Sequence, residues 1–130
     1  MPVHFEFNSK HKILLVVVKG EIKGADVQSV KAAVTEQANR LQPASLIVDL
    51  SRITKFDVTA EIMRSTARQP SPLAESVPSF LVAPQEYLFG MARMYEQVAS
   101  GKRPNLKVAH TLQEALAALG VENPEFEHVE

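Results

Sequence analysis

Two acids and three hydroxyls crowd into one stretch of the chain, and these residues could do chemistry. Asp49 and Asp57 lie eight residues apart, the first near the end of an apolar run and the second before a helical pattern. Such a pair could bind a cation or act as acid and base. In the structural alternative, Asp49 bonds turn amides and Asp57 caps the following helix. Because nothing nearby completes a metal shell, we favour the structural alternative and expect no metal and no cofactor.

The hydroxyl groups of this stretch belong to Ser51, Thr54 and Thr59. One of them could accept a phosphate, because the free amides and dipole of a helix N-terminus stabilise added negative charge. The local alternative is that these side chains only bond the turn and the helix cap. Thr59 is the best placed possible phosphoacceptor, ahead of Ser51.

Histidine is the other residue type that could take part in catalysis, and none of the four histidines lies at metal-ligand spacing with another. His110 follows an expected strand and precedes a helix cap, so it could lie at the same edge. An enzyme would need a pocket that gathers Asp49, Asp57 and His110. The sequence contains no G-x-S-x-G elbow, dinucleotide fingerprint or phosphate loop. We therefore predict no catalytic residues and no enzymatic activity.

The elements that must position these residues follow from hydrophobic periodicity. Period-two alternation or short apolar runs predict strands, whereas apolar steps of three and four predict helices. The expected strands are 3–7, 13–18, 45–50, 77–83 and 106–109, and the expected helices are 25–41, 58–68, 84–100 and 112–119. The order β-β-α-β-α-β-α-β-α predicts an α/β fold with a mixed, largely parallel sheet of about five strands and about four helices.

Size and charge indicate a single domain without a general affinity for nucleic acid or membrane. The 130 residues fit one domain over 1–121, followed by an acidic C-terminal tail over 122–130 that we expect to be loosely held. With 14 basic and 15 acidic residues the net charge is -1. No basic stripe with interleaved aromatics is present, so we expect no nucleic-acid partner.

The absence of cysteine excludes disulfides, thiolate metal sites and a cysteine nucleophile, and fits a reducing compartment. The first residues lack the layout of a signal peptide. The longest apolar run, 13–18, is too short to span a bilayer. We expect a cytoplasmic protein.

The helix expected over 84–100 has more apolar side chains than one buried stripe needs. The core-facing stripe comprises Leu88, Met91, Ala92, Tyr95 and Val98. Tyr87, Phe89 and Met94 point partly away from it and, with Met91, could bind an apolar small molecule against the helix over 58–68 or form a homodimer interface. Alternatively, the loop over 70–76 or the C-terminal tail covers them. Gly90 costs this helix about 1 kcal/mol relative to alanine and could permit a close approach.

The segment VDLSRITKFDVT, residues 48–59, resembles the strand-turn-helix motif of STAS domains, the anti-sigma-factor-antagonist-like (SpoIIAA-like) superfamily. The order of elements matches that fold over nearly the whole chain. The segments FLVAPQEYLFGMARMYEQV and VAHTLQEALAALG look like a divergent bacterial branch of it. The resemblance implies a STAS-like fold and a non-catalytic regulatory or protein-interaction module.

The motif departs from the family pattern where the family is phosphorylated. In antagonists of this family the first hydroxyl after the motif's Asp carries the phosphate, and that position is Val58 here. Thr59 takes the second hydroxyl position, and Ala60 replaces the glycine that follows. What the resemblance still implies is a partner-docking surface around Asp57 and the second helix. Its candidate residues are Ser51, Thr54, Asp57, Thr59, Glu61 and Arg64.

Overall fold

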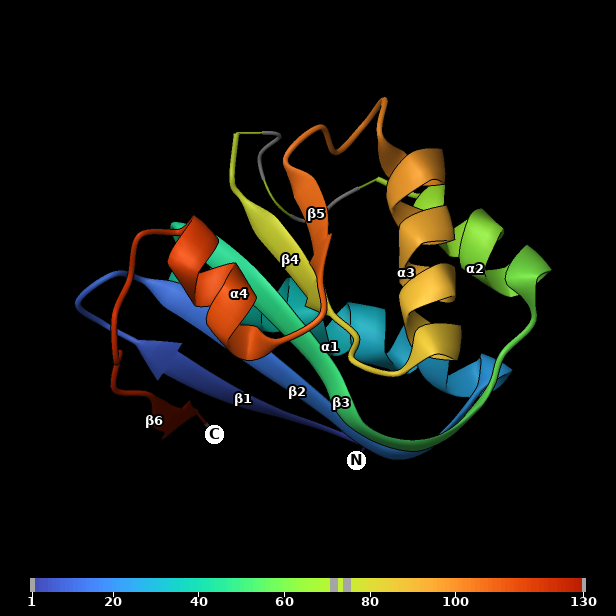
Figure 1. Ribbon diagram of the computed structural model, residues 1–130, viewed down its shortest axis with the longest axis horizontal. Helices are drawn as coiled ribbons and strands as arrows, with labels where there is room; N and C mark the ends of the chain where they lie inside the picture. Colours follow the sequence, from blue (N-terminus) through green and yellow to red (C-terminus); the bar gives the residue numbers. More distant parts are fainter. Residues whose placement is uncertain (1, 71–72, 74–75, 130) are drawn as a thin grey trace.

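The computed structural model describes residues 2–70, 73 and 76–129. Strands and helices alternate after an opening hairpin, as the sequence predicts (Figure 1). The elements are β1 (Val3–Asn8), β2 (Ile13–Lys23), α1 (Gly24–Leu41), β3 (Ser45–Asp57), α2 (Ala60–Ala67), β4 (Ser79–Val82), α3 (Glu86–Ala99), β5 (Leu106–Ala109), α4 (Leu112–Ala118) and β6 (Glu127–Val129).

The strands form one six-stranded sheet in the order β5-β4-β3-β2-β1-β6. β2, β3, β4 and β5 are parallel to one another, whereas β1 pairs antiparallel with β2 and with β6. Helices α1, α2 and α3 pack on one face of the sheet and α4 packs on the other. This confirms the mixed, largely parallel α/β architecture, with one strand more than expected.

The extra strand comes from the segment that follows α4. Phe5 of β1 pairs with Val129, and the Asn8 side-chain amide donates a 2.7 Å hydrogen bond to the Glu125 carbonyl. Phe126 packs against the core on the α4 face. The expectation of a loosely held tail is therefore wrong for these residues. A three-residue strand reading EHV carries too few apolar side chains to show a period of two.

Strands β2 and β3 are much longer than their apolar runs. Their pairing continues to Lys23 opposite Asp57, through register shifts beside Val17 and Gly20. In this extension, charged residues are exposed while Ile53 is buried in the core. The strand expected over 45–50 therefore ends too early, because Ser51 and Arg52 continue β3 as far as Asp57.

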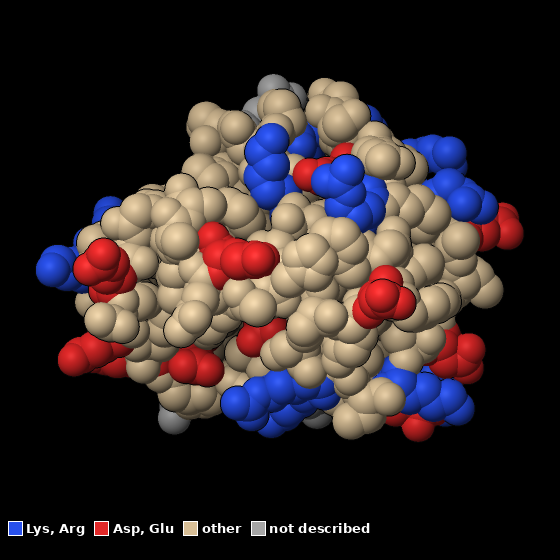
Figure 2. Space-filling view, in the orientation of Figure 1, with Lys and Arg blue, Asp and Glu red and all other residues tan. Residues whose placement is uncertain are grey.

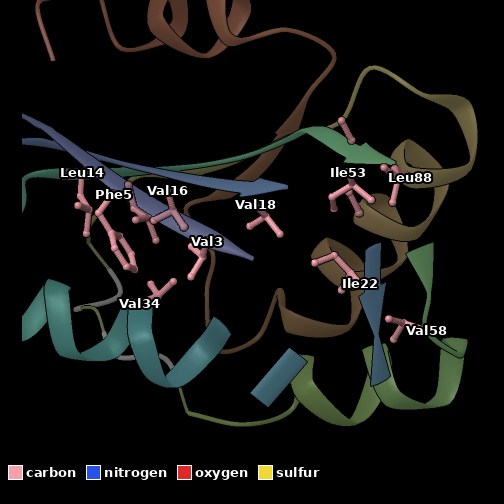
Figure 3. Packing of buried hydrophobic residues seen from close by; sticks show 13 residues of the cluster. Val3, Phe5, Leu14, Val16, Val18, Ile22, Val34, Ile53, Val58 and Leu88 are labelled. Carbon is pink, nitrogen blue, oxygen red and sulfur yellow. The ribbon is translucent and has the colours of Figure 1, made fainter. Parts of the chain in front are cut away.

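The larger core lies between the sheet and α1, α2 and α3. Figure 3 shows Val16 and Val18 of β2 and Val34 of α1 within this layer, with Ile53 and Leu88 farther along it. A second core lies under α4, where Ile47 is fully buried at the centre of β3. Alternation along β3 thus sends Leu46 and Val48 to one core and Ile47 to the other.

Candidate functional site

The first acid, Asp49, belongs to the structural framework of β3. It is buried, and its carboxylate accepts a 2.9 Å hydrogen bond from the Ser51 backbone N–H. Asp57 ends the same strand eight residues later, up to about 26 Å away along an extended chain. Among the described residues, no group of three or more His, Cys, Asp or Glu could hold a metal ion.

The second acid does not cap α2, contrary to the prediction for Asp57. The N-cap is Thr59, whose hydroxyl accepts a 3.2 Å hydrogen bond from the Ile62 N–H. Val58 separates the two and is buried in the core, so the chain stays extended until Thr59 and the helix begins at Ala60. Asp57 instead ends β3 with its side chain exposed, opposite Lys23 of β2.

Replacing Thr59 by alanine should lower the free energy of unfolding by about 1 kcal/mol, because the Ile62 N–H loses its acceptor. Urea denaturation measures this loss. Thr59→Ser keeps the hydroxyl and should retain most of the stability. An equal loss in both variants would mean that the methyl group of Thr59, and not the cap, stabilises α2.

The six docking candidates all have exposed side chains, and we call them the docking edge: Ser51, Thr54, Asp57, Thr59, Glu61 and Arg64. None of them forms an ion pair with another described residue. Two contacts connect the docking edge to α3. The Gln85 amide donates to the Ser51 carbonyl at 3.4 Å, and the Arg64 guanidinium lies 3.6 Å from the Met94 sulfur.

The apolar residues singled out on α3 do not form one surface. Tyr87 is 62% exposed and meets Phe56 of β3 edge-on, with ring centroids 6.4 Å apart. Phe89 stacks on His110, with centroids 3.9 Å apart. Met91 points to the interior, where it lines a cavity, while Met94 contacts Arg64. The sequence could not separate these roles, because only the tertiary neighbours of each side chain distinguish them.

Three other expectations concern His110, Gly90 and the loop over 70–76. His110 does lie at the carboxyl edge of β5, but neither the cavity under the helices nor the pocket beside the β1–β2 turn is lined by His110, Asp49 or Asp57. A Cβ on Gly90 would meet no atom within 4 Å, so within the described chain this glycine permits no close approach. The covering loop over 70–76 includes residues 71, 72, 74 and 75, which lie outside the described residues.

An apolar cavity of about 160 Å³ lies between the sheet and helices α1, α2 and α3. Val48 and Leu50 of β3 and Leu81 of β4 line it and stay half-buried, although both strands lie inside the sheet. Residues from the sheet and from helices α1, α2 and α3 line this cavity, so no single sequence motif marks it.

Basic side chains gather where the cavity meets the end of α2. Lys31 and Arg103 line the cavity. The Lys31 ammonium donates to the Gln69 side chain at 2.9 Å and to the Thr66 carbonyl at 3.4 Å, while Lys102 donates to the Arg68 carbonyl at 2.5 Å. Burial lowers the pKa of Lys31 below its ordinary 10.5, and the nearby charges of Arg103 and Lys102 lower it further.

The depressed pKa of Lys31 predicts a stability trend at alkaline pH. Between its folded-state pKa and 10.5, the unfolded chain still holds a proton that the folded chain has released. The wild type should therefore gain stability relative to Lys31→Met as pH rises through this window. Urea denaturation at pH 7 and pH 10 measures the difference, with Lys10→Met as a control for the loss of one lysine charge. A difference that stays constant with pH would contradict the prediction.

The comparisons with known proteins concern the fold. No protein-family model and no curated protein matches the sequence. An anti-sigma factor antagonist from Mycobacterium paratuberculosis superposes with a TM-score of 0.61 at 20% identity, over 91% of this chain and 92% of that one. SpoIIAA in its unphosphorylated form superposes with a TM-score of 0.54 at 16% identity, over 92% of this chain and 99% of that one. The Bacillus cell fate determinant SpoIIAA in its phosphorylated form superposes with a TM-score of 0.53 at 18% identity, over 89% of this chain and 98% of that one.

The chain has the fold of the anti-sigma factor antagonists. The resemblance read from the VDLSRITKFDVT segment is thereby confirmed for the fold. In this anti-sigma-factor-antagonist fold, the strand of the motif is β3 and the helix of the motif is α2. Val58 is buried between them and Thr59 is exposed, so Thr59 carries the accessible hydroxyl next to Asp57.

The surface of this anti-sigma-factor-antagonist fold carries both signs of charge. Figure 2 shows acidic and basic side chains separated by broad uncharged areas on the face that it draws. Among the described residues, no helix is long and apolar enough to cross a membrane.

Proposed function

We propose that this protein is a cytoplasmic regulatory module without catalysis of its own, which docks a partner protein through the docking edge. The observation that carries the proposal is that these six side chains are exposed and form no ion pair with a described residue. They lie at the junction of β3 and α2. Charged groups without an internal partner are available to pair with a partner's charges.

The fold supports this proposal. The solved structures that share it include proteins described as anti-sigma factor antagonists, a name that implies action on another protein. In the present chain, Glu61 and Arg64 lie three residues apart on α2 and therefore share one side of the helix. Opposite charges at this spacing would fix the register of a partner carrying the complementary pair.

Phosphorylation of Thr59 would regulate the same surface. One of the matched structures is a phosphorylated form of SpoIIAA. A phosphate on Thr59 would add negative charge at the N-terminus of α2, beside Asp57 and Glu61. The docking edge would become strongly acidic, which changes the partner that it can accept.

Affinity capture from the source cells tests the docking proposal. Wild type and Asp57→Lys serve as baits, with Lys10→Glu in the β1–β2 turn as a matched control for a reversed surface charge. A protein retained by wild type and by Lys10→Glu but lost with Asp57→Lys is the expected result. Equal capture by all three baits would show that the docking edge is not the binding surface.

Self-association through α3 is a second candidate, because Tyr87 is the exposed large hydrophobic residue among those described. Sedimentation velocity at rising protein concentration should then show a dimer that Tyr87→Ser weakens. A monomer at every concentration would exclude this candidate.

A further inference from the structure

The helical layer does not close over the middle of the sheet. Strands inside a sheet that is covered on both faces normally bury their apolar residues completely. Here Val48, Leu50 and Leu81 are half-buried because the cavity separates them from the helices. Met63 of α2 and Met91 of α3 complete the opposite wall, and both are flexible side chains that adapt to an occupant. The cavity is therefore a preformed apolar space.

The cavity is lined mostly by apolar side chains, and its charged side chains lie close together at one place. Its polar groups are few, and Lys31 and Arg103 supply its cationic ones. The charge of Lys102 adds to theirs, since it acts on the Lys31 ammonium. No acid among the described residues forms an ion pair with any of these cations.

Two of these three cations form hydrogen bonds that stabilise the end of α2. Lys31 and Lys102 donate to carbonyls at the C-terminal end of α2, where positive charge is favourable. The Arg103 guanidinium donates to neither of these two carbonyls. A guanidinium is suited to bind a carboxylate through parallel hydrogen bonds.

We propose that the cavity binds the hydrocarbon chain of a monocarboxylic acid, with the carboxylate held by Arg103 and Lys31. An apolar cavity of about 150 Å³ is known to accept a six-carbon ring, and this one measures about 160 Å³. A chain of about six to eight carbons therefore suits it. This site lies inside the helical layer and does not depend on the proposed docking edge.

Titration calorimetry on the wild type tests the proposal without any substitution. Octanoate is the probe, 1-octanol is the matched ligand without a charge, and acetate is the head group alone. Octanoate should bind at least about tenfold more tightly than 1-octanol, because the alcohol carries no negative charge and cannot accept two parallel hydrogen bonds from a guanidinium. Absence of octanoate binding, or equal affinity for octanoate and 1-octanol, would overturn it.

Two variants then locate the ligand. Arg103→Gln should weaken octanoate binding about tenfold and leave 1-octanol unaffected, while Lys10→Gln, at the exposed β1–β2 turn, should change neither. Leu81→Phe fills the cavity and should abolish binding of both ligands, with thermal unfolding used to verify that it folds. Octanoate binding that survives both Arg103→Gln and a folded Leu81→Phe would place the ligand elsewhere and contradict the proposal.

Discussion

Replacing Ile47 by alanine should lower the free energy of unfolding by about 3 to 4 kcal/mol, within the range measured for large-to-small changes in rigid cores. Ile47 is fully buried at the centre of β3, between β2 and β4, and contacts the core under α4. The strands on either side fix the backbone, so the lost volume cannot be recovered by collapse. Urea denaturation monitored by circular dichroism measures the change.

The matched control for this prediction lies on the same face, under the same helix. Leu116 of α4 is only half-buried, and Leu116→Ala should cost clearly less than Ile47→Ala because its site is partly hydrated and can relax. Equal losses at the two positions would mean that the α4 layer is packed as tightly as the centre of the sheet, contrary to the structure.

Reversing both charges of α2, with Glu61→Lys and Arg64→Glu together, should lower the affinity for the captured partner about 100-fold. The reason is that each mispaired charge in an interface costs on the order of 1 to 2 kcal/mol of binding free energy. The double variant keeps the net charge and should fold normally, because both side chains are exposed and form no ion pair with a described residue. Surface plasmon resonance with the partner measures the loss.

The control for the reversal uses α3, where Arg93 and Glu96 form a 2.8 Å ion pair. Reversing both of these charges keeps the net charge and the pair, and should leave partner affinity within about twofold, as expected for charges outside the interface. An unchanged affinity in the α2 variant would remove α2 from the docking edge.

Hydrophobic patterning was sufficient to predict most of the sheet and its helical layers. The run of residues 13–18 is buried throughout in β2, as a continuous apolar run indicates. Thr111 and Glu114 stand at the three-residue spacing of a capping box, and both of its hydrogen bonds form at the start of α4. These features are local or strictly periodic, so they need no knowledge of the tertiary structure.

The missed features depend on neighbours distant in the sequence. Lys19 and Glu21 interrupt the apolar run, yet β2 continues because β3 pairs with it over the same stretch. Asp57 and Thr59 are both good cap residues, and the burial of Val58 between them decides in favour of Thr59. The strand β6 exists because β1 offers it an edge.

The candidate site was predicted in outline only. All six docking residues are exposed, as a docking surface requires, whereas the four residues proposed for α3 have separate environments. Spacing along a helix identifies which side chains share a side, but it does not reveal that Phe89 meets His110 or that Met91 faces a cavity. Those outcomes depend on how far α3 stands from the sheet.

We propose that β3 and α2 form the docking surface. Hydrogen exchange of the full chain, measured with and without the captured partner, tests it most directly. We expect slower exchange over residues 51–64 in the complex, with little change in α4 and β6 on the opposite side of the molecule. Protection confined to α4 and β6, with residues 51–64 unchanged, would contradict it.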